Sequence, residues 1–253
     1  MKEVLLIETI YGPFQKDLFK YFKYRINKML GELDITLDTI TITDSGNIYI
    51  RFFGDDEEFT YNFLKKEFHI CKNFEDLKNN VKYFGKFVEV NKYGYGIYVN
   101  VGAIHNDTFS DALIPLHKLR EQLVQNKKIS TRKIIDIYGI INEMPTEILI
   151  TNIDPGNYKI EAEFSKKQLN RFKKWVDKGL QRVNINGVLN NIIQKVLKRT
   201  GHTRDIIKTE RLGLFEYSMV CKEDTEAPGI IKDIGPHLPG IEMNAFIPDE
   251  IVK

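Results

Sequence analysis

The chain has 253 residues, 42% hydrophobic and 28% charged, a composition typical of folded proteins with one to three domains. It contains no apolar stretch long enough to span a membrane. An acidic residue occurs within the first eight positions, too early for a signal peptide, and the two cysteines lie too far apart for a disulfide framework. The net charge of +2 conceals a basic stretch, residues 159–211, with 14 basic and five acidic side chains, which favours a polyanionic partner.

The first part, residues 1–80, predicts an α/β sandwich in the order βαββα. Apolar residues recur every three or four positions from Phe14 to Leu30, which indicates a helix that ends at Gly31. This part has no glycine-rich phosphate loop, so we assign it no chemistry. The other predicted elements are a strand at 4–7, two strands at 38–42 and 47–53 joined by a turn, and a helix at 56–68.

The second part, residues 81–153, predicts a small barrel. Five strands with a helix after the third are the order of an OB-type barrel, a fold that binds oligonucleotides on its second and third strands. The predicted strands are 84–90, 95–101, 111–116, 132–141 and 147–153, and the helix is 116–125.

Three segments of this part carry a family resemblance: GKFVEV at 85–90, YGIYVNVG at 95–102 and ALIPL at 112–116. They resemble the first three strands of an S1-type RNA-binding domain. The resemblance implies that Tyr95 and Tyr98 stack on bases, and Pro115 stands where the family has a histidine that contacts RNA. We assign Lys86, Lys92 and Tyr93 to the same RNA-binding set. Because Tyr95 and Tyr98 lie three apart on a strand, the alternative is that one belongs to the core.

The whole chain also resembles an uncharacterised archaeal protein family of unknown function, through the segments KRTGHTRDII at 198–207 and APGII at 227–231. That resemblance implies a cytoplasmic archaeal protein and no particular mechanism.

The third part, residues 154–253, predicts an α/β domain with a basic helical face. After a strand at 158–164, Ser165 and Gln168 form a capping box that starts a helix. A second helix ends at Gly201, which can adopt the left-handed cap conformation. The remaining predicted elements are strands at 206–212, 215–221 and 243–247 and a helix at 227–237.

Four cations share one side of the first of these helices, and we call them the cation row: Lys167, Arg171, Lys174 and Lys178. Like charges at this spacing repel one another, which destabilises the helix slightly. A line of phosphates along the row would replace this repulsion by attraction. The alternative is an ordinary solvated face. If the two helices lie side by side, the basic surface continues through a second set: Lys195, Lys198, Arg199 and Arg204.

No residue pattern predicts catalysis, a cofactor or a metal site. His202 and Asp205 are read as a connecting loop, and the sequence has no metal-ligand spacing. We therefore expect a non-catalytic, cytoplasmic RNA-binding protein that acts on ribosomal or transfer RNA in translation or RNA processing. The alternative is a protein-interaction module of a transcription or ribosome-associated complex, which would use the acidic segment 212–253 and a free sheet edge.

Overall fold

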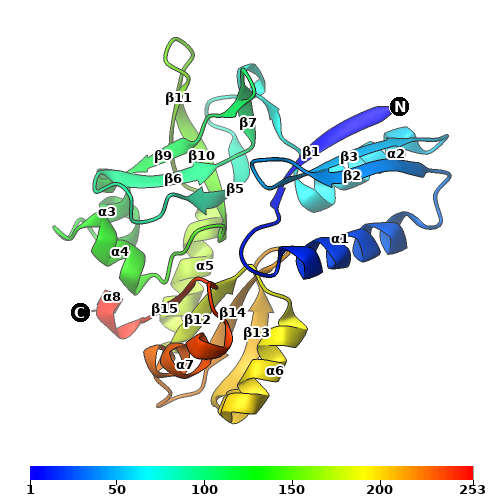
Figure 1. The fold of residues 1–253 in the computed structure, drawn as a ribbon. Coiled ribbons are helices and arrows are strands. Elements are labelled where there is room, and N and C mark those ends of the chain that lie inside the picture. The colour runs from blue at the N-terminus through cyan, green and yellow to red at the C-terminus, as the bar shows by residue number, and fades with distance from the viewer. Residues whose placement is uncertain (253) are drawn as a thin grey trace.

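The computed structural model describes residues 1–252, which form an α+β protein with a closed five-stranded barrel in its central region (Figure 1). Buried apolar side chains form three clusters, one under the amino-terminal sheet, one in the barrel and one under the carboxy-terminal sheet. The predicted α+β fold with several parts is therefore confirmed. Within the described residues, no helix has the length and apolar character needed to cross a membrane.

The amino-terminal part has the predicted βαββα order. Its antiparallel sheet has the strand order β1-β3-β2, and both helices bury side chains in one core with the sheet. The ring of Phe22 meets that of Phe68 edge-on, with 5.5 Å between centroids, so the two helices contact each other. The elements are β1 (Lys2–Thr9), α1 (Gln15–Leu30), β2 (Thr36–Ile42), β3 (Asn47–Phe53) and α2 (Glu57–Phe68).

The central barrel closes through the strand order β10-β11-β9-β6-β5, with β5 paired to β10. All neighbouring strands are antiparallel except β9 and β11. Two helices, α3 (Leu116–Val124) and α4 (Thr131–Ile137), follow the third strand, which agrees with the OB-type order expected from sequence. The barrel strands are β5 (Lys82–Val88), β6 (Gly96–Asn100), β9 (Ala112–Pro115), β10 (Pro145–Asp154) and β11 (Lys159–Phe164).

One predicted barrel strand is wrong. Residues 132–141 contain α4, which begins after Ser130, whose hydroxyl accepts a hydrogen bond from the amide of Lys133 at 3.2 Å. The strand predicted at 158–164 exists as β11, and it closes the barrel rather than joining the third part. A small sheet of β4 (Lys72–Asn73), β7 (Ala103–His105) and β8 (Thr108–Phe109) lies beside the barrel, next to the turn η1 (Phe74–Asp76).

The carboxy-terminal sheet has the order β13-β14-β12-β15 and separates two layers of helices. α6 and α7 share a core with one face, whereas the apolar side chains of α5 (Lys166–Asp177) join the barrel cluster on the other face (Figure 1). Gly201 has φ +82° and ends α6 as predicted. The elements are β12 (Arg182–Asn186), α6 (Asn190–Thr200), η2 (His202–Asp205), β13 (Ile206–Arg211), β14 (Glu216–Cys221), α7 (Ala227–Ile234), η3 (Gly235–His237), β15 (Met243–Phe246) and α8 (Asp249–Val252).

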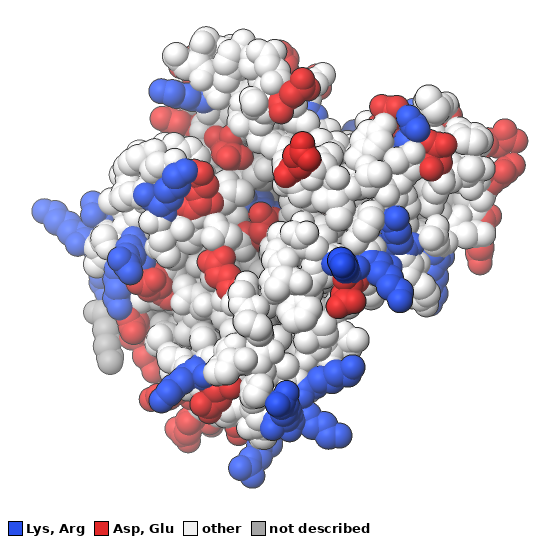
Figure 2. Space-filling model, viewed as in Figure 1, with Lys and Arg blue, Asp and Glu red and all other residues white. Residues whose placement is uncertain are grey.

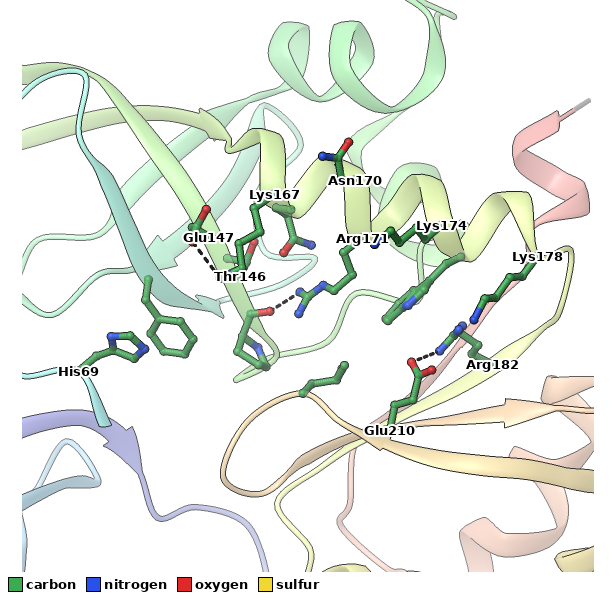
Figure 3. Close-up of a pocket in the computed structure, with 15 residues that line it drawn as sticks. His69, Thr146, Glu147, Lys167, Asn170, Arg171, Lys174, Lys178, Arg182 and Glu210 are labelled. Carbon is green, nitrogen blue, oxygen red and sulfur yellow. Dashed lines mark hydrogen bonds and ion pairs between the residues drawn. The ribbon is translucent and has the colours of Figure 1, made fainter. Parts of the chain in front are cut away.

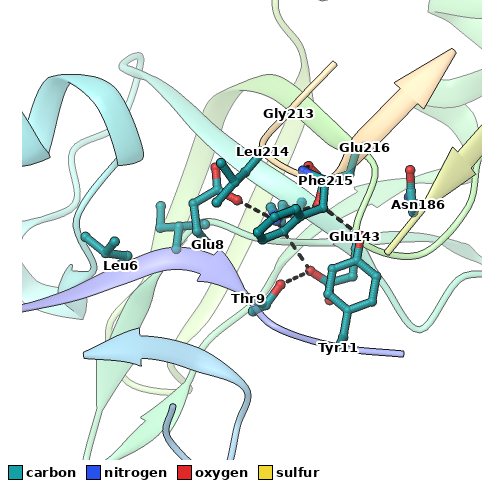
Figure 4. A network of polar contacts seen from close by, with 12 residues as sticks. Leu6, Glu8, Thr9, Tyr11, Glu143, Asn186, Gly213, Leu214, Phe215 and Glu216 are labelled. Carbon is teal, nitrogen blue, oxygen red and sulfur yellow. Dashed lines mark hydrogen bonds and ion pairs between the residues drawn. The ribbon is translucent and has the colours of Figure 1, made fainter. Parts of the chain in front are cut away.

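A buried ion network connects the three parts. Lys86 of β5 is 1% exposed, and its Nζ lies 2.8 Å from Glu8 Oε2 of β1 and 3.0 Å from Glu216 Oε1 of β14. The Tyr11 hydroxyl donates to the same Glu216 oxygen at 2.9 Å (Figure 4). Glu143, after α4, adds a third carboxylate 3.8 Å from Lys86 Nζ. Each part of the chain therefore supplies at least one charged member.

The network corrects the assignment of Lys86 to RNA. Burial raises the pKa of Glu8 and of Glu143. For Lys86 burial acts in the opposite direction, and the three carboxylates still raise its pKa above the ordinary value. Lys86 is thus a buried, charged structural group without a free surface for a phosphate. We remove it from the RNA-binding set.

Candidate functional site

The helix α5 positions the cation row. Ser165 accepts a hydrogen bond from the amide of Gln168 at 3.2 Å, so the predicted cap is present. The reciprocal bond of the box is absent, because the Ser165 amide donates to the carbonyl of Glu147 at 3.1 Å instead. Phe172 and Trp175 are 2% and 4% exposed and pack into the barrel cluster. Anchoring these rings orients the helix, so that the neighbouring side carries the cations.

All four members of the cation row line one cavity of about 800 Å³, which we call the α5 cavity (Figure 3). Its walls come from α5, from the barrel strands β5 and β10, and from the carboxy-terminal sheet. Arg182 of β12 is a fifth cation in the lining, and Glu147 and Glu210 are the two carboxylates. Five cations against two carboxylates leave an excess of three positive charges, so the cavity attracts anions.

Both carboxylates of the α5 cavity already have cationic partners. Glu210 accepts from Arg182 at 2.6 Å, and Glu147 lies 3.4 Å from Lys167 Nζ. Burial alone would raise the pKa of both acids, but hydrogen bonds and cations hold it below the ordinary value. Lys174 and Lys178 are exposed. They have no ion-pair partner among residues 1–252, so their charges are available to a ligand.

Several buried polar atoms in the lining lack a hydrogen-bond partner within the described chain. Thr146, Gln168 and Arg182 are 1–2% exposed, and the unpaired atoms are Thr146 Oγ1, Gln168 Nε2 and Arg182 Nε. Arg171 Nε is also buried and unpaired. All four groups can donate a hydrogen bond. Because buried donors are nearly always paired in folded proteins, this group is suited to a ligand with acceptor oxygens.

Two guanidinium groups flank the indole of Trp175. The centre of the Arg182 guanidinium lies 4.4 Å from the ring centroid and that of Arg171 lies 5.8 Å away. Arg171 also donates to the carbonyl of Pro145 at 2.7 Å. Burial lowers the pKa of Arg171 to about 10, so it remains charged at neutral pH. Arg171 was predicted as a member of the cation row, and in the structure its guanidinium is fixed between α5 and β10.

The second set of cations, on α6 and η2, does not extend the cation row. Lys195, Lys198, Arg199 and Arg204 are exposed, and none of them lines the α5 cavity. The prediction of one continuous basic surface required α5 and α6 to lie side by side. They pack against opposite faces of the same sheet, so the second set does not join the cation row. Figure 2 shows basic side chains gathered over α6 at the lower end of the molecule.

The three predicted tyrosines gather at the start of β6, and we call them the tyrosine cluster. The ring centroids of Tyr93 lie 5.4 Å from Tyr95 and 5.3 Å from Tyr98, and the hydroxyls of Tyr95 and Tyr98 are 3.0 Å apart. Tyr95 is 53% exposed because it precedes the strand, which begins at Gly96. Tyr98 is half-buried and belongs to none of the three core clusters. The alternative that Tyr95 or Tyr98 is a core residue is therefore wrong.

The surroundings of the tyrosine cluster are acidic. Tyr93 and Tyr98 line a separate cavity of about 370 Å³, in which three acids, Glu89, Asp111 and Glu161, outnumber one cation, Lys159. Burial and the nearby carboxylates raise the pKa of Asp111 to about 6. Lys92, also assigned to RNA, is exposed and forms an ion pair with Glu89. The cluster offers aromatic surface for bases but repels phosphates more than the α5 cavity does.

The loop after α6 has no free base. The two ring nitrogens of His202 lie 2.8 Å from Asp205 and 3.0 Å from Asp233, and these partners raise the pKa of His202. With both nitrogens held, the histidine links η2 to α7, in keeping with its prediction as a loop residue.

Sequence reasoning missed most of the lining of the α5 cavity, including His69, Phe84, Trp175 and Arg182. They come from four separate elements or loops, so no local spacing connects them. The only available signal was the basic character of Arg182 inside the basic stretch 159–211.

Two models of one protein family match the chain. The DUF2110 central domain matches residues 77–176, and the DUF2110 C-terminal domain matches residues 180–246. No curated protein matches the sequence. Among solved structures, the a/eIF2alpha–aDim2p–rRNA complex from Pyrococcus horikoshii OT3 contains a chain with 11% sequence identity and a TM-score of 0.26. The match covers 49% of this chain and 64% of that one, which is less than two thirds of its length.

Proposed function

We propose that this chain, which belongs to the DUF2110 family, is an RNA-binding protein whose α5 cavity holds phosphates of the RNA backbone. The observation that supports the proposal most is the α5 cavity itself, with its excess of three positive charges and its unpaired buried donors. Phosphate oxygens accept hydrogen bonds and carry the opposite charge, so they satisfy both features together.

The tyrosine cluster is the second proposed RNA contact. An exposed tyrosine can stack on an unpaired base, and Tyr95 is more than half exposed. With the S1 resemblance of residues 85–116, this supports an S1-type role for the barrel. We propose that the protein acts in the cytoplasm on structured RNA such as ribosomal or transfer RNA. Unpaired loops of such RNA would supply the bases that the tyrosines accept.

Removing the exposed lysines of the row tests the α5 cavity. The triple variant Lys167→Gln, Lys174→Gln, Lys178→Gln should weaken binding of single-stranded RNA by about tenfold or more. The slope of log affinity against log salt should become shallower by about two, since each lost phosphate contact on a single strand removes about 0.7. Fluorescence anisotropy between about 50 and 200 mM salt measures both.

The matched control removes three charges from α6: Lys195→Gln, Lys198→Gln and Arg199→Gln. It changes the net charge equally, so a purely long-range effect would weaken RNA binding in both variants. Equal loss in the two triples would reject the α5 cavity as the site. If an acidic protein displaces RNA equally well from both triple variants, the protein-interaction alternative is favoured.

Replacing Tyr95 tests the tyrosine cluster separately. Tyr95→Ala should weaken single-stranded RNA binding by at least about fivefold and leave duplex binding nearly unchanged, because only unpaired bases can stack on the ring. Gel-shift titrations with a loop RNA and a matched duplex measure the difference. If both affinities fall together, Tyr95 does not act through stacking.

A further inference from the structure

A second cavity of about 240 Å³ adjoins the α5 cavity at the amino-terminal part of the molecule. The two cavities share three lining residues, His69, Phe84 and Leu212, which come from three different parts of the chain. Figure 3 shows His69 at one end of the α5 cavity, at a distance from Arg182 and Glu210 at the other. The two cavities therefore lie next to each other at the junction of all three parts, and we treat them as one groove.

An aromatic pair marks the point where the cavities meet. The rings of His69 and Phe84 are stacked, with centroids 4.0 Å apart and planes inclined by 15°. Burial lowers the pKa of His69, and Lys72 and Lys167 lower it further, so the imidazole is neutral at neutral pH. With Leu212, the pair is an apolar segment of a groove that is otherwise charged.

The second cavity supplies its own cations, Arg25 of α1 and Arg211 of β13. Arg211 donates to the carbonyls of Gly213 and Leu214 at 2.8 and 2.9 Å, which holds its guanidinium in place. Two acids are also present, Glu8 and Glu67. Glu8 is paired with Lys86 in the buried network, and Glu67 is exposed at the rim.

We propose that a single strand of RNA runs along this groove, with phosphates on the cation row and on Arg25 and Arg211 and with one base on the His69–Phe84 pair. This inference rests on the proposed function and deepens it, because it specifies single-stranded RNA and the path that the strand takes along the groove. It also gives the amino-terminal part a role in binding. Along the groove, the cationic α5 cavity is followed by the apolar pair and then by the two arginines of a cavity in which cations and acids balance. Phosphate, base and phosphate can follow one another on these surfaces.

The aromatic pair restricts the ligand to unpaired nucleotides. A base inside a duplex has both faces covered by its neighbours, so it cannot lie on another ring without leaving the stack. Stacking on an aromatic ring accepts any of the four bases. The groove is therefore selective for single strands and indifferent to sequence.

The experiment compares two RNA probes of about 12 nucleotides, within the range that small barrels cover. One is oligouridine and the other has the same backbone with its bases removed. Phe84→Leu keeps an apolar side chain but removes the ring, so it should weaken oligouridine binding at least about fivefold and reduce the preference for the probe with bases by the same factor. The salt slope should not change. The matched control is Phe59→Leu, which removes an exposed ring on α2 that lines neither cavity.

Arg25→Gln should reduce the salt slope for the long probe by about 0.7 and leave a probe of about four nucleotides unaffected, because the short one fits within the α5 cavity. If wild-type protein binds RNA but Phe84→Leu has the same oligouridine affinity and the same preference for bases as wild type, the path is wrong and the proposed function stands. If wild-type protein binds neither probe at low salt, the proposed function itself fails. Equally tight binding of a polyglutamate peptide would assign the groove to acidic proteins and overturn the path.

Discussion

α5 and α6 are two basic helices on opposite faces of one sheet, and they differ in what lies opposite their cations. The cations of α5 face the barrel wall across a cavity, and one of them, Arg171, is held by Pro145 and Trp175. The cations of α6 are exposed at the end of the molecule. The same local charge pattern therefore forms a lined groove in one place and a solvated surface in the other.

The difference shows why a row of cations in a sequence does not identify a binding site. A cation on an open surface is strongly hydrated and screened by salt, so it attracts a polyanion only weakly and without fixed geometry. Within a cavity the field is less screened, and buried donors such as Gln168 and Arg182 can direct an anion. The neighbouring wall, rather than the helix, makes the site.

An arginine-to-lysine substitution on each helix should produce the largest difference between α5 and α6 in its effect on the free energy of unfolding. Arg171→Lys should lower the free energy of unfolding by about 1–2 kcal/mol, because an ammonium is more strongly hydrated and cannot both donate to Pro145 and lie over Trp175. Arg199→Lys, on the exposed side of α6, should stay within about 0.5 kcal/mol of wild type. Urea unfolding followed by circular dichroism measures both.

Trp175 fluorescence gives an independent check on Arg171, because this is the chain's single tryptophan. Its emission should change in Arg171→Lys and remain constant in Arg199→Lys. Equal stability of the two variants would mean that α5 holds its cations no more firmly than α6 does.

A smaller effect should arise at the end of α6, where His202 bridges Asp205 and Asp233. Asp205 contributes most to raising the pKa of His202, and Asp233 adds to it. The stabilisation from the charged histidine is complete below the unfolded-state value of about 6.5 and is lost as pH rises through the higher folded-state value. His202→Gln should therefore lower the Tm by on the order of 1–2 °C at about pH 6 and by less at about pH 9.

Thermal unfolding of both proteins over this pH range measures the difference. Asp233→Asn is the partner control and should reduce the pH dependence without removing it, since Asp205 remains. A Tm difference that grows toward alkaline pH would contradict the assignment, because a raised histidine pKa can only act in the other direction.

Local patterns predicted most of the elements. The apolar spacing from Phe14 to Leu30 corresponds to α1, the Ser165 cap starts α5, and Gly201 ends α6. The wrong strand at 132–141 has a local cause as well. Its isoleucines favour a strand by propensity, but Ser130 caps a short helix there, and the cap together with burial of Ile134 and Ile135 outweighs propensity.

The central strand β12 could not be recognised from its own residues. Arg182, Asn184 and Asn186 alternate with Val183 and Ile185, and all five are buried. Such polar residues are usually exposed, so the segment resembles a surface strand or a loop. Their partners are distant in sequence: Asn184 donates to the carbonyl of Gly139 at 2.8 Å, and Asn186 to that of Asn142 at 2.5 Å.

The amino-acid sequence by itself determined the α+β class, most helices and strands, and which side of α5 carries cations, because each of these depends on residues within a turn or two of one another. Only the tertiary structure decided that Lys86 lies in a buried ion network, that α6 faces away from α5, and that His69 and Phe84 meet at the α5 cavity. Those outcomes depend on contacts between segments far apart in the chain, and no local spacing encodes them.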